Sequence, residues 1–183
     1  MFAHYWQYTD AVSKTLFFIL FALSLASWVV AIVRLLQSHK IVNTISRELS
    51  DKIHHDSKDF SHLEFAQRKT VAEQLLLQYI SGYRFELEKG LPVLGTTAAI
   101  APFIGLFGTV WGIFHALHSI AKSGQAGLAQ VAGPVGEALI MTGLGLAVAI
   151  PAVVFFNIIT RMNKRALHNA NNTAHQLLAS IVR

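Results

Sequence analysis

One carboxylate in a long apolar stretch is the residue of this sequence best placed for chemistry. Glu137 is the only charged residue between positions 123 and 160. An ionisable group inside a membrane helix costs roughly 3 kcal/mol on insertion scales, so it usually marks a functional site. Thr109 and Thr142 add two hydroxyls in neighbouring apolar sequence, and a hydroxyl can hydrogen-bond a carboxyl group or water. These three residues predict an ion-handling site within a membrane helix bundle.

A helical hairpin would bring the two threonines together. Thr109 and Thr142 are equally far along the chain from a turn centred between residues 125 and 126. In a symmetric hairpin they therefore lie at the same depth. Glu137 precedes Thr142 by five residues, which at a rise of about 1.5 Å per residue places it roughly 7–8 Å away along the helix.

Each of these features also has a plainer interpretation. A threonine in a helix often bonds the carbonyl four residues before it, and a lone glutamate can be protonated and simply packed. Small residues in membrane helices most often serve packing alone. The matched depth of the polar residues favours an ion pathway over packing.

Small residues on both helices predict how closely the hairpin packs. Faces of glycine and alanine let membrane helices approach one another. The expected packing residues are Gly105, Gly108 and Gly112 in the first helix, and Ala138, Gly145 and Ala149 in the second.

Three uncharged runs are long enough to carry such a site across a membrane. A span needs about 20 apolar residues. The first run covers residues 15–33, between Lys14 and Arg34. The second covers residues 90–121, and the third covers residues 123–160 apart from Glu137.

Composition supports a membrane protein. The 183 residues are 53% hydrophobic and 14% charged, whereas soluble domains have about 25% charged residues. The net charge of +5 comes from basic residues beside the apolar runs, which fits membrane topology and not a nucleic-acid partner. The absence of cysteine excludes disulfides and thiolate metal sites.

The distribution of basic residues predicts the orientation. Residues 37–89 carry eight Lys/Arg, and residues 161–183 carry four with no acidic residue. Lys122 is the one basic residue of the turn at 122–127. Basic loops stay in the cytoplasm, so the C-terminus is expected in the cytoplasm and the N-terminus on the opposite side of the membrane. We expect membrane lipid around the chain, including anionic lipid at the cytoplasmic side.

The predicted fold is all-α: a three-span transmembrane protein whose long helices extend into the cytoplasm. The expected parts are a periplasmic N-terminal segment at 1–14, transmembrane helices at 15–36, 90–121 and 128–160, a cytoplasmic helical segment at 37–89, a short periplasmic turn at 122–127 and a cytoplasmic C-terminal helix at 161–183.

Enzymatic chemistry is not expected. The sequence has no phosphate-binding loop, no nucleophile paired with a base and no paired catalytic carboxylates, so we expect neither catalytic residues nor a cofactor. His115 and His118 lie about one turn apart, but two histidines make an incomplete zinc site. No metal site is expected, and the histidines favour an interfacial position.

Two motifs carry a family resemblance. Residues 102–112 read PFIGLFGTVWG, and residues 135–157 read VGEALIMTGLGLAVAIPAVVFFN. Both resemble signatures of the ExbB/TolQ/MotA proton-channel family. Within the family the sequence is most similar to the ExbB branch of the TonB-ExbB-ExbD system, and the four-span flagellar branch fits poorly.

The resemblance implies a multi-pass protein of the bacterial inner membrane that forms a homopentameric ring around a pore. It also implies an ExbD-like single-span partner, whose aspartate takes up and releases protons, and coupling to TonB for import across the outer membrane. By motif, Thr109 and Thr142 match the polar pore positions of the family, and Glu137 matches its membrane acid.

Three alternatives remain open from the sequence. A TolQ-type subunit of the Tol-Pal system, which serves outer-membrane constriction, is the nearest. A passive ion channel that works without a partner and a membrane scaffold that conducts nothing belong to other classes of function.

Overall fold

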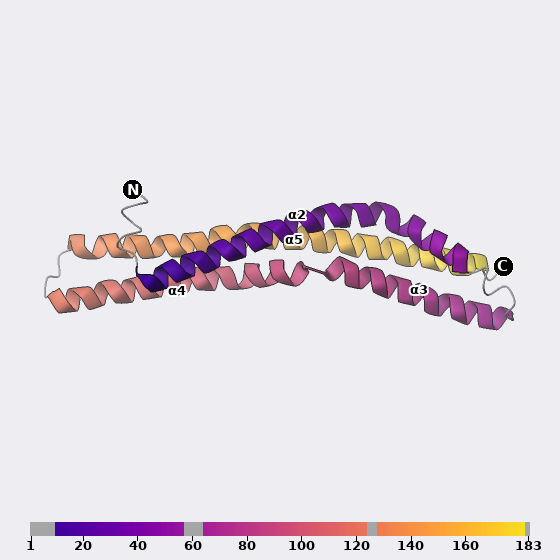
Figure 1. Ribbon diagram of the computed structural model, residues 1–183, viewed down its shortest axis with the longest axis horizontal. Coiled ribbons are helices and arrows are strands. Elements are labelled where there is room, and N and C mark those ends of the chain that lie inside the picture. Colours follow the sequence, from indigo (N-terminus) through magenta and orange to yellow (C-terminus); the bar gives the residue numbers. More distant parts are fainter. Residues whose placement is uncertain (1–9, 57–63, 124–127, 182–183) are drawn as a thin grey trace. The chain divides into compact units, whose positions relative to one another are not determined.

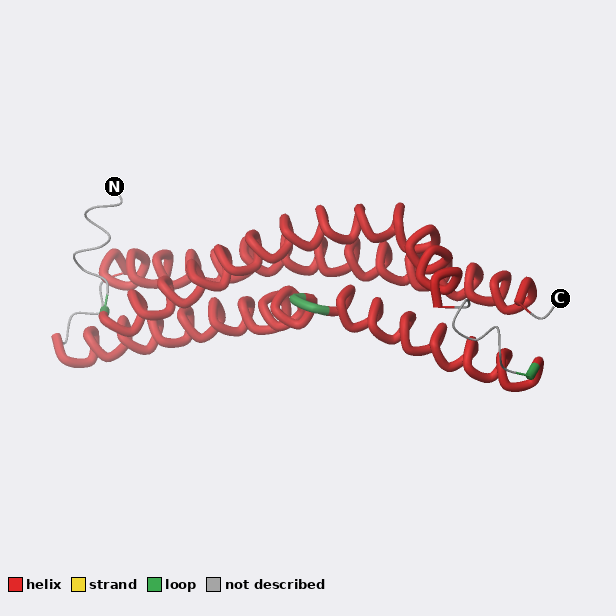
Figure 2. Tube along the Cα trace, turned by 45° about the vertical axis from the view of Figure 1, so that its right-hand side comes forward, coloured by secondary structure: helices red, strands yellow, loops and turns green. Residues whose placement is uncertain are grey.

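The described chain is built almost wholly from helices. The computed structural model describes residues 10–56, 64–123 and 128–181. The helices are α2 (Ala11–Asp56), α3 (Phe65–Glu88), α4 (Leu91–Ser123) and α5 (Leu128–Ile181), shown in chain order in Figure 1. Figure 2 shows helix along the described chain, interrupted only by short connecting segments. The all-α fold class is therefore confirmed.

Three stretches of these helices are long and apolar enough to cross a membrane. They are Ala11–Val42, Ala66–Lys122 and Ala132–Ala179. The prediction of three membrane spans is confirmed. Most of the turn expected at 122–127 and most of the N-terminal segment expected at 1–14 lie outside the described residues.

The chain divides into two compact units. Unit 1 comprises Met1–Ala31 and Val93–Phe156, and unit 2 comprises Ile32–Pro92 and Asn157–Arg183. Unit 1 thus holds the start of α2, nearly all of α4 and the first half of α5. Unit 2 holds the rest of α2, all of α3 and the end of α5.

The core of unit 1 is a small apolar cluster. Leu16 and Leu20 of α2 meet Ala101 of α4 and Met141 and Ala149 of α5. Hydrocarbon tails are as apolar as leucine, so close packing rather than the hydrophobic effect holds such helices together in a membrane.

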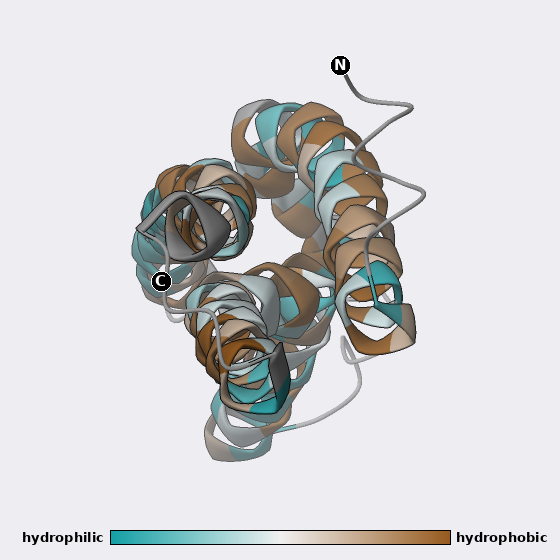
Figure 3. Cartoon of the chain, turned by 90° about the vertical axis from the view of Figure 1, so that its left-hand side faces the viewer, coloured by the Kyte–Doolittle hydropathy of each residue, from teal (hydrophilic) through white to brown (hydrophobic). Residues whose placement is uncertain are grey.

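The outer face of unit 1 stays apolar. Phe103, Val110 and Phe114 on α4 are exposed, as are Phe18 and Phe21 on α2. Figure 3 shows brown apolar residues alternating with teal hydrophilic residues along the helices. A lipid environment accepts such side chains, whereas water would not.

Unit 2 has a core of three helices that resembles a soluble bundle. Its buried residues recur at helical spacing: Ile45, Leu49 and Ile53 from α2, Leu76 and Ile80 from α3, and Ala170, Ala174 and Leu177 from α5. Residues four apart lie on one side of a helix, so each helix buries one stripe.

The bundle gives a first prediction from two adjacent leucines of α3. Leu76 is 2% exposed and Leu77 is 66% exposed. We expect Leu76→Ala to lower the free energy of unfolding by about 2–5 kcal/mol, because it leaves a cavity. Leu77→Ala should change it by less than about 0.5 kcal/mol. Denaturant unfolding of the detergent-solubilised chain measures both, and equal losses would contradict the burial of Leu76.

Candidate functional site

The two threonines predicted from the sequence meet in unit 1. Thr109 of α4 and Thr142 of α5 have their Oγ1 atoms 2.9 Å apart, within hydrogen-bond distance. Thr109 is 6% exposed, and Thr142 is half-buried. The pair therefore forms a polar bridge between two apolar helices, and Thr142 is its more accessible member.

The bridge has more acceptors than hydrogens. The Oγ1 of Thr109 lies 2.7 Å from the carbonyl oxygen of Leu106 and 3.4 Å from that of Gly105. The Oγ1 of Thr142 lies 3.3 Å from the same Gly105 oxygen. Each hydroxyl has one hydrogen and can rotate it. The pair can therefore redirect a hydrogen to another acceptor while the remaining contacts persist.

The helices can approach this closely because glycines face the bridge. A Cβ at Gly105 would lie 2.7 Å from the carbonyl oxygen of Met141, and one at Gly145 would lie 2.6 Å from that of Ala101. At Gly112 the nearest atom would be the Cβ of Ala138, at 2.8 Å. All three distances are shorter than carbon atoms in proteins normally show, so the two backbones lie in contact at Gly105 and Gly145, and the Ala138 side chain contacts the backbone at Gly112.

The other two expected packing residues lie in the same region. A Cβ at Gly108 would lie 2.9 Å from the Cβ of Met141. Ala149 is buried in the core cluster of unit 1. All six expected packing residues thus lie in unit 1, five of them directly between α4 and α5.

Glu137 stands apart from the threonines. Its side chain is exposed, although its neighbour Ala138 is buried at the helix contact. Among the residues that the structure describes, Glu137 has no hydrogen-bond or ion-pair partner. Within the described residues, the carboxyl group of Glu137 thus lies unpaired on an apolar helix.

A second set of glycines on α5 is open. Among the described residues, no atom would lie within 4 Å of a Cβ at Gly133, Gly136 or Gly143. The sequence does not distinguish these glycines from the packed ones, because both sets occur in the same small-residue run. Their difference follows from the rotation of α5 against α4.

The two histidines each have a neighbour other than a metal-binding group. The Nδ1 of His115 lies 3.2 Å from the Oδ2 of Asp10, and the His118 ring stacks on Phe114 with the ring centroids 6.2 Å apart. Within the described ranges, no three His, Cys, Asp or Glu side chains are grouped to hold a metal ion.

Sequence reasoning missed two buried polar residues of unit 2. Asn163 of α5 and Ser38 of α2 are 4% and 2% exposed, and the Ser38 hydroxyl donates to the Asn163 Oδ1 at 2.9 Å. A signal was present in the sequence. Asn163 follows Ile159 and precedes Ala166 at the spacing of one helical face, so it interrupts an apolar stripe.

The chain matches proteins of one membrane family. A model of the MotA/TolQ/ExbB proton channel family matches residues 45–172. The biopolymer transport protein ExbB of Xanthomonas campestris pv. campestris (strain B100) is 45% identical over 114 residues, which cover 62% of this chain and 45% of that protein. ExbB of Neisseria gonorrhoeae is 45% identical over 117 residues, covering 62% and 53%.

TolQ proteins match over a shorter stretch. The Tol-Pal system protein TolQ of Haemophilus influenzae is 52% identical over 71 residues, which cover 39% of this chain and 31% of that protein. The chain spans about half the length of the ExbB relatives that it matches.

The helix contact gives a second prediction, with matched glycines on α4 and α5. Gly105→Ala should lower the free energy of unfolding by about 1–3 kcal/mol, because the new methyl group meets a backbone oxygen that cannot move aside. Gly143→Ala adds the same atom in open space and should be neutral or stabilise the helix by up to about 1 kcal/mol. Thermal unfolding of the purified chain in detergent measures both. A neutral Gly105→Ala would contradict the close contact.

Proposed function

Since the chain belongs to the MotA/TolQ/ExbB proton channel family, we propose that it is a motor stator subunit that uses the proton motive force. Membership of a channel family agrees with the expectation that it is no enzyme. The observation that carries the proposal is the Thr109–Thr142 bridge, a pair of hydroxyls 2.9 Å apart within apolar spans. Thr109, Thr142 and Glu137 are proposed to line the proton pathway.

The hydroxyl pair suits a carboxyl group that changes its charge. A carboxylate accepts hydrogen bonds, and a protonated carboxyl group also donates one. The threonine hydroxyls can serve both forms, because each can donate or accept. Thr142 is the half-buried member, so it is the one that we expect the moving carboxyl group to meet, with Thr109 behind it.

The carboxyl group that cycles is proposed to come from a partner. Glu137 is the only Asp or Glu between residues 90 and 160, so this chain offers no second acid in spans two and three. An ExbD-like single-span partner would supply the cycling aspartate. One charge that crosses 100 mV releases about 2.3 kcal/mol, enough to bias the partner's position within a ring.

In this proposal Glu137 lines the proton pathway. Its carboxyl group is exposed and without a partner in the described chain, which is a costly state for an isolated protein in lipid. Assembly would relieve that cost by placing Glu137 against a neighbouring subunit or the partner. We propose an electrostatic role for it rather than the role of proton carrier.

The proposed setting is the bacterial inner membrane, with the N-terminus in the periplasm and the C-terminus in the cytoplasm. The proposed assembly is a homopentamer that surrounds the ExbD-like partner and energises TonB. The apolar outer face of unit 1 and the open glycines of α5 support association with further helices. Anionic lipid at the basic cytoplasmic side belongs to the same proposal.

A TolQ-type subunit of a Tol-Pal system is the second candidate. The TolQ relative has the higher identity, 52%, but over 71 residues. The ExbB relatives match over 114 and 117 residues. The longer match favours the ExbB role.

The threonines give a third prediction. We expect Thr142→Ala to lower proton flux through the assembled complex in vesicles by about tenfold or more, because it removes a hydrogen bond to an ionised group. Thr142→Ser keeps the hydroxyl and should restore most of the flux. Thr109→Ala should cause a smaller loss, because Thr109 is the buried member. Coupling at the wild-type level in both alanine variants would contradict the pore assignment.

Glu137 gives a fourth prediction, which separates the proposal from its rivals. Glu137→Gln keeps the size and removes the charge, so flux should fall while the assembled complex remains. A non-conducting scaffold predicts that Glu137→Gln leaves the activity of the complex unchanged, whereas a larger residue at Gly105 or Gly112 disrupts its assembly. A passive channel predicts flux from vesicles that contain this chain alone, whereas the proposal requires the partner.

A further inference from the structure

The chain breaks its helix where charged sequence gives way to apolar sequence. α3 ends at Glu88 and α4 begins at Leu91. Between them Gly90 has a φ of 76°, a left-handed value that glycine adopts most readily. Pro92 follows in the first turn of α4 and has no N–H to donate. The break is therefore specified locally by two residues.

A break of this kind leaves carbonyl groups at the end of α3 without helical partners. The last four carbonyls of a helix have no N–H from the next turn. The backbone N–H of Lys89 donates to the Phe85 carbonyl at 3.2 Å. The next two carbonyls, of Glu86 and Leu87, need donors from elsewhere.

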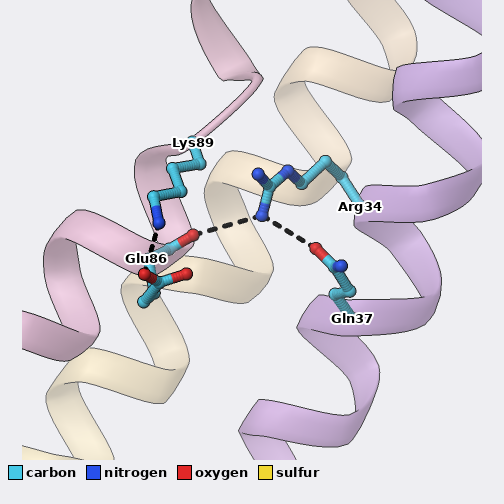
Figure 4. Close-up of polar contacts among 4 residues, drawn as sticks. All are labelled: Arg34, Gln37, Glu86 and Lys89. Carbon is cyan, nitrogen blue, oxygen red and sulfur yellow. Dashed lines mark hydrogen bonds and ion pairs between the residues drawn. The ribbon is translucent and has the colours of Figure 1, made fainter.

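Side chains from the two other helices of unit 2 supply these donors. Arg34 of α2 donates from Nη1 to the Glu86 carbonyl at 3.2 Å and to the Gln37 Oε1 at 2.8 Å. Figure 4 shows this arginine between Gln37 and the end of α3, where Lys89 pairs with the Glu86 carboxylate. Asn163 of α5 donates from Nδ2 to the Leu87 carbonyl at 2.6 Å.

The Asn163 contact is buried, and its partners determine which way the amide points. The Leu87 carbonyl can only accept a hydrogen bond, so the amide nitrogen must face it. The amide oxygen then faces Ser38, whose hydroxyl donates to it at 2.9 Å. The three residues join α2, α3 and α5 by two hydrogen bonds inside unit 2.

Packing alone does not account for this arrangement. An apolar residue at position 163 would fit the stripe of Ile159 and Ala166, but it would leave the Leu87 carbonyl buried and unpaired. A buried polar group without a partner is costly, whereas two apolar groups in place of a bonded pair can be nearly neutral. The Asn163 amide is therefore explained by the Leu87 carbonyl group that the helix break leaves unpaired, and not by the packing of the core.

We propose that Asn163 is a positioning residue that holds the α3–α4 break through the Leu87 carbonyl. α4, which carries Thr109, begins four residues after Leu87. A loose break would let the start of that helix vary, and proton movement would suffer although the threonine bridge is intact. The effect on proton movement rests on the proposed function, whereas the effect on the break does not.

Hydrogen exchange and proton flux test the proposal together. At a pH at which its carboxyl group is ionised, Asn163→Asp keeps an acceptor for Ser38 and removes the donor to Leu87. We expect amide exchange over residues 86–92 to become about tenfold faster, with no change over residues 45–53. Flux through vesicles that contain the full chain and its partner should fall by about fivefold or more, which is the order of one hydrogen bond.

Two further variants keep the outcome decisive. Ser38→Ala removes the other bond of Asn163 and should change exchange at the break and flux by less than about twofold. The double variant Ser38→Ala with Asn163→Leu replaces both polar side chains with apolar ones, so it buries no unpaired side chain. It serves as the test if Asn163→Asp fails to fold. It should still speed exchange at the break.

The outcomes are distinct. Unchanged exchange over residues 86–92 in Asn163→Asp and in the double variant would overturn the positioning role. Faster exchange with wild-type flux would overturn the link to proton movement. Absence of flux from the wild-type complex would overturn the proposed function, and the exchange result would still decide the role of Asn163.

Discussion

The contact between the backbones of α4 and α5 is the constraint on which the rest of unit 1 depends. Gly105 and Gly145 allow the two helices to lie very close together. A methyl group would lie 2.7 Å from a carbonyl oxygen of the other helix at Gly105 and 2.6 Å from one at Gly145. Only at this separation can two short threonine side chains reach across and bond. The polar bridge is thus a product of the apolar packing around it.

Polar groups in an apolar setting divide into satisfied and unsatisfied ones. The hydroxyls of Thr109 and Thr142 and the amide of Asn163 have partners within the chain. These hydrogen bonds offset the free-energy cost of burying the polar groups when the chain folds. Glu137 has none among the described residues. In physical terms, the first group helps to specify the fold of one chain, whereas the carboxyl group of Glu137 makes no such contribution within the described residues.

Spacing predicted the meeting of Thr109 and Thr142, because the constant rise of a helix turns equal distances from a turn into equal depth. Their role in a pathway stays a prediction. The isolation of Glu137 was not predictable, because it depends on the rotation of α5 about its axis. The Asn163 contact was not predictable either, because Gly90 and Pro92 indicate where α3 ends but not which side chain of another helix meets its last carbonyl groups.

A helix contact made by glycine and alanine has a mechanical consequence. Glycine and alanine side chains have no rotamers, so none are frozen when these helices associate, and none can rearrange to absorb a small displacement. A contact of long side chains can yield gradually, atom by atom. Where glycine and alanine meet, the α4–α5 contact has no such compliance, so only Met141 and the two threonines could adjust to a displacement of one helix along the other.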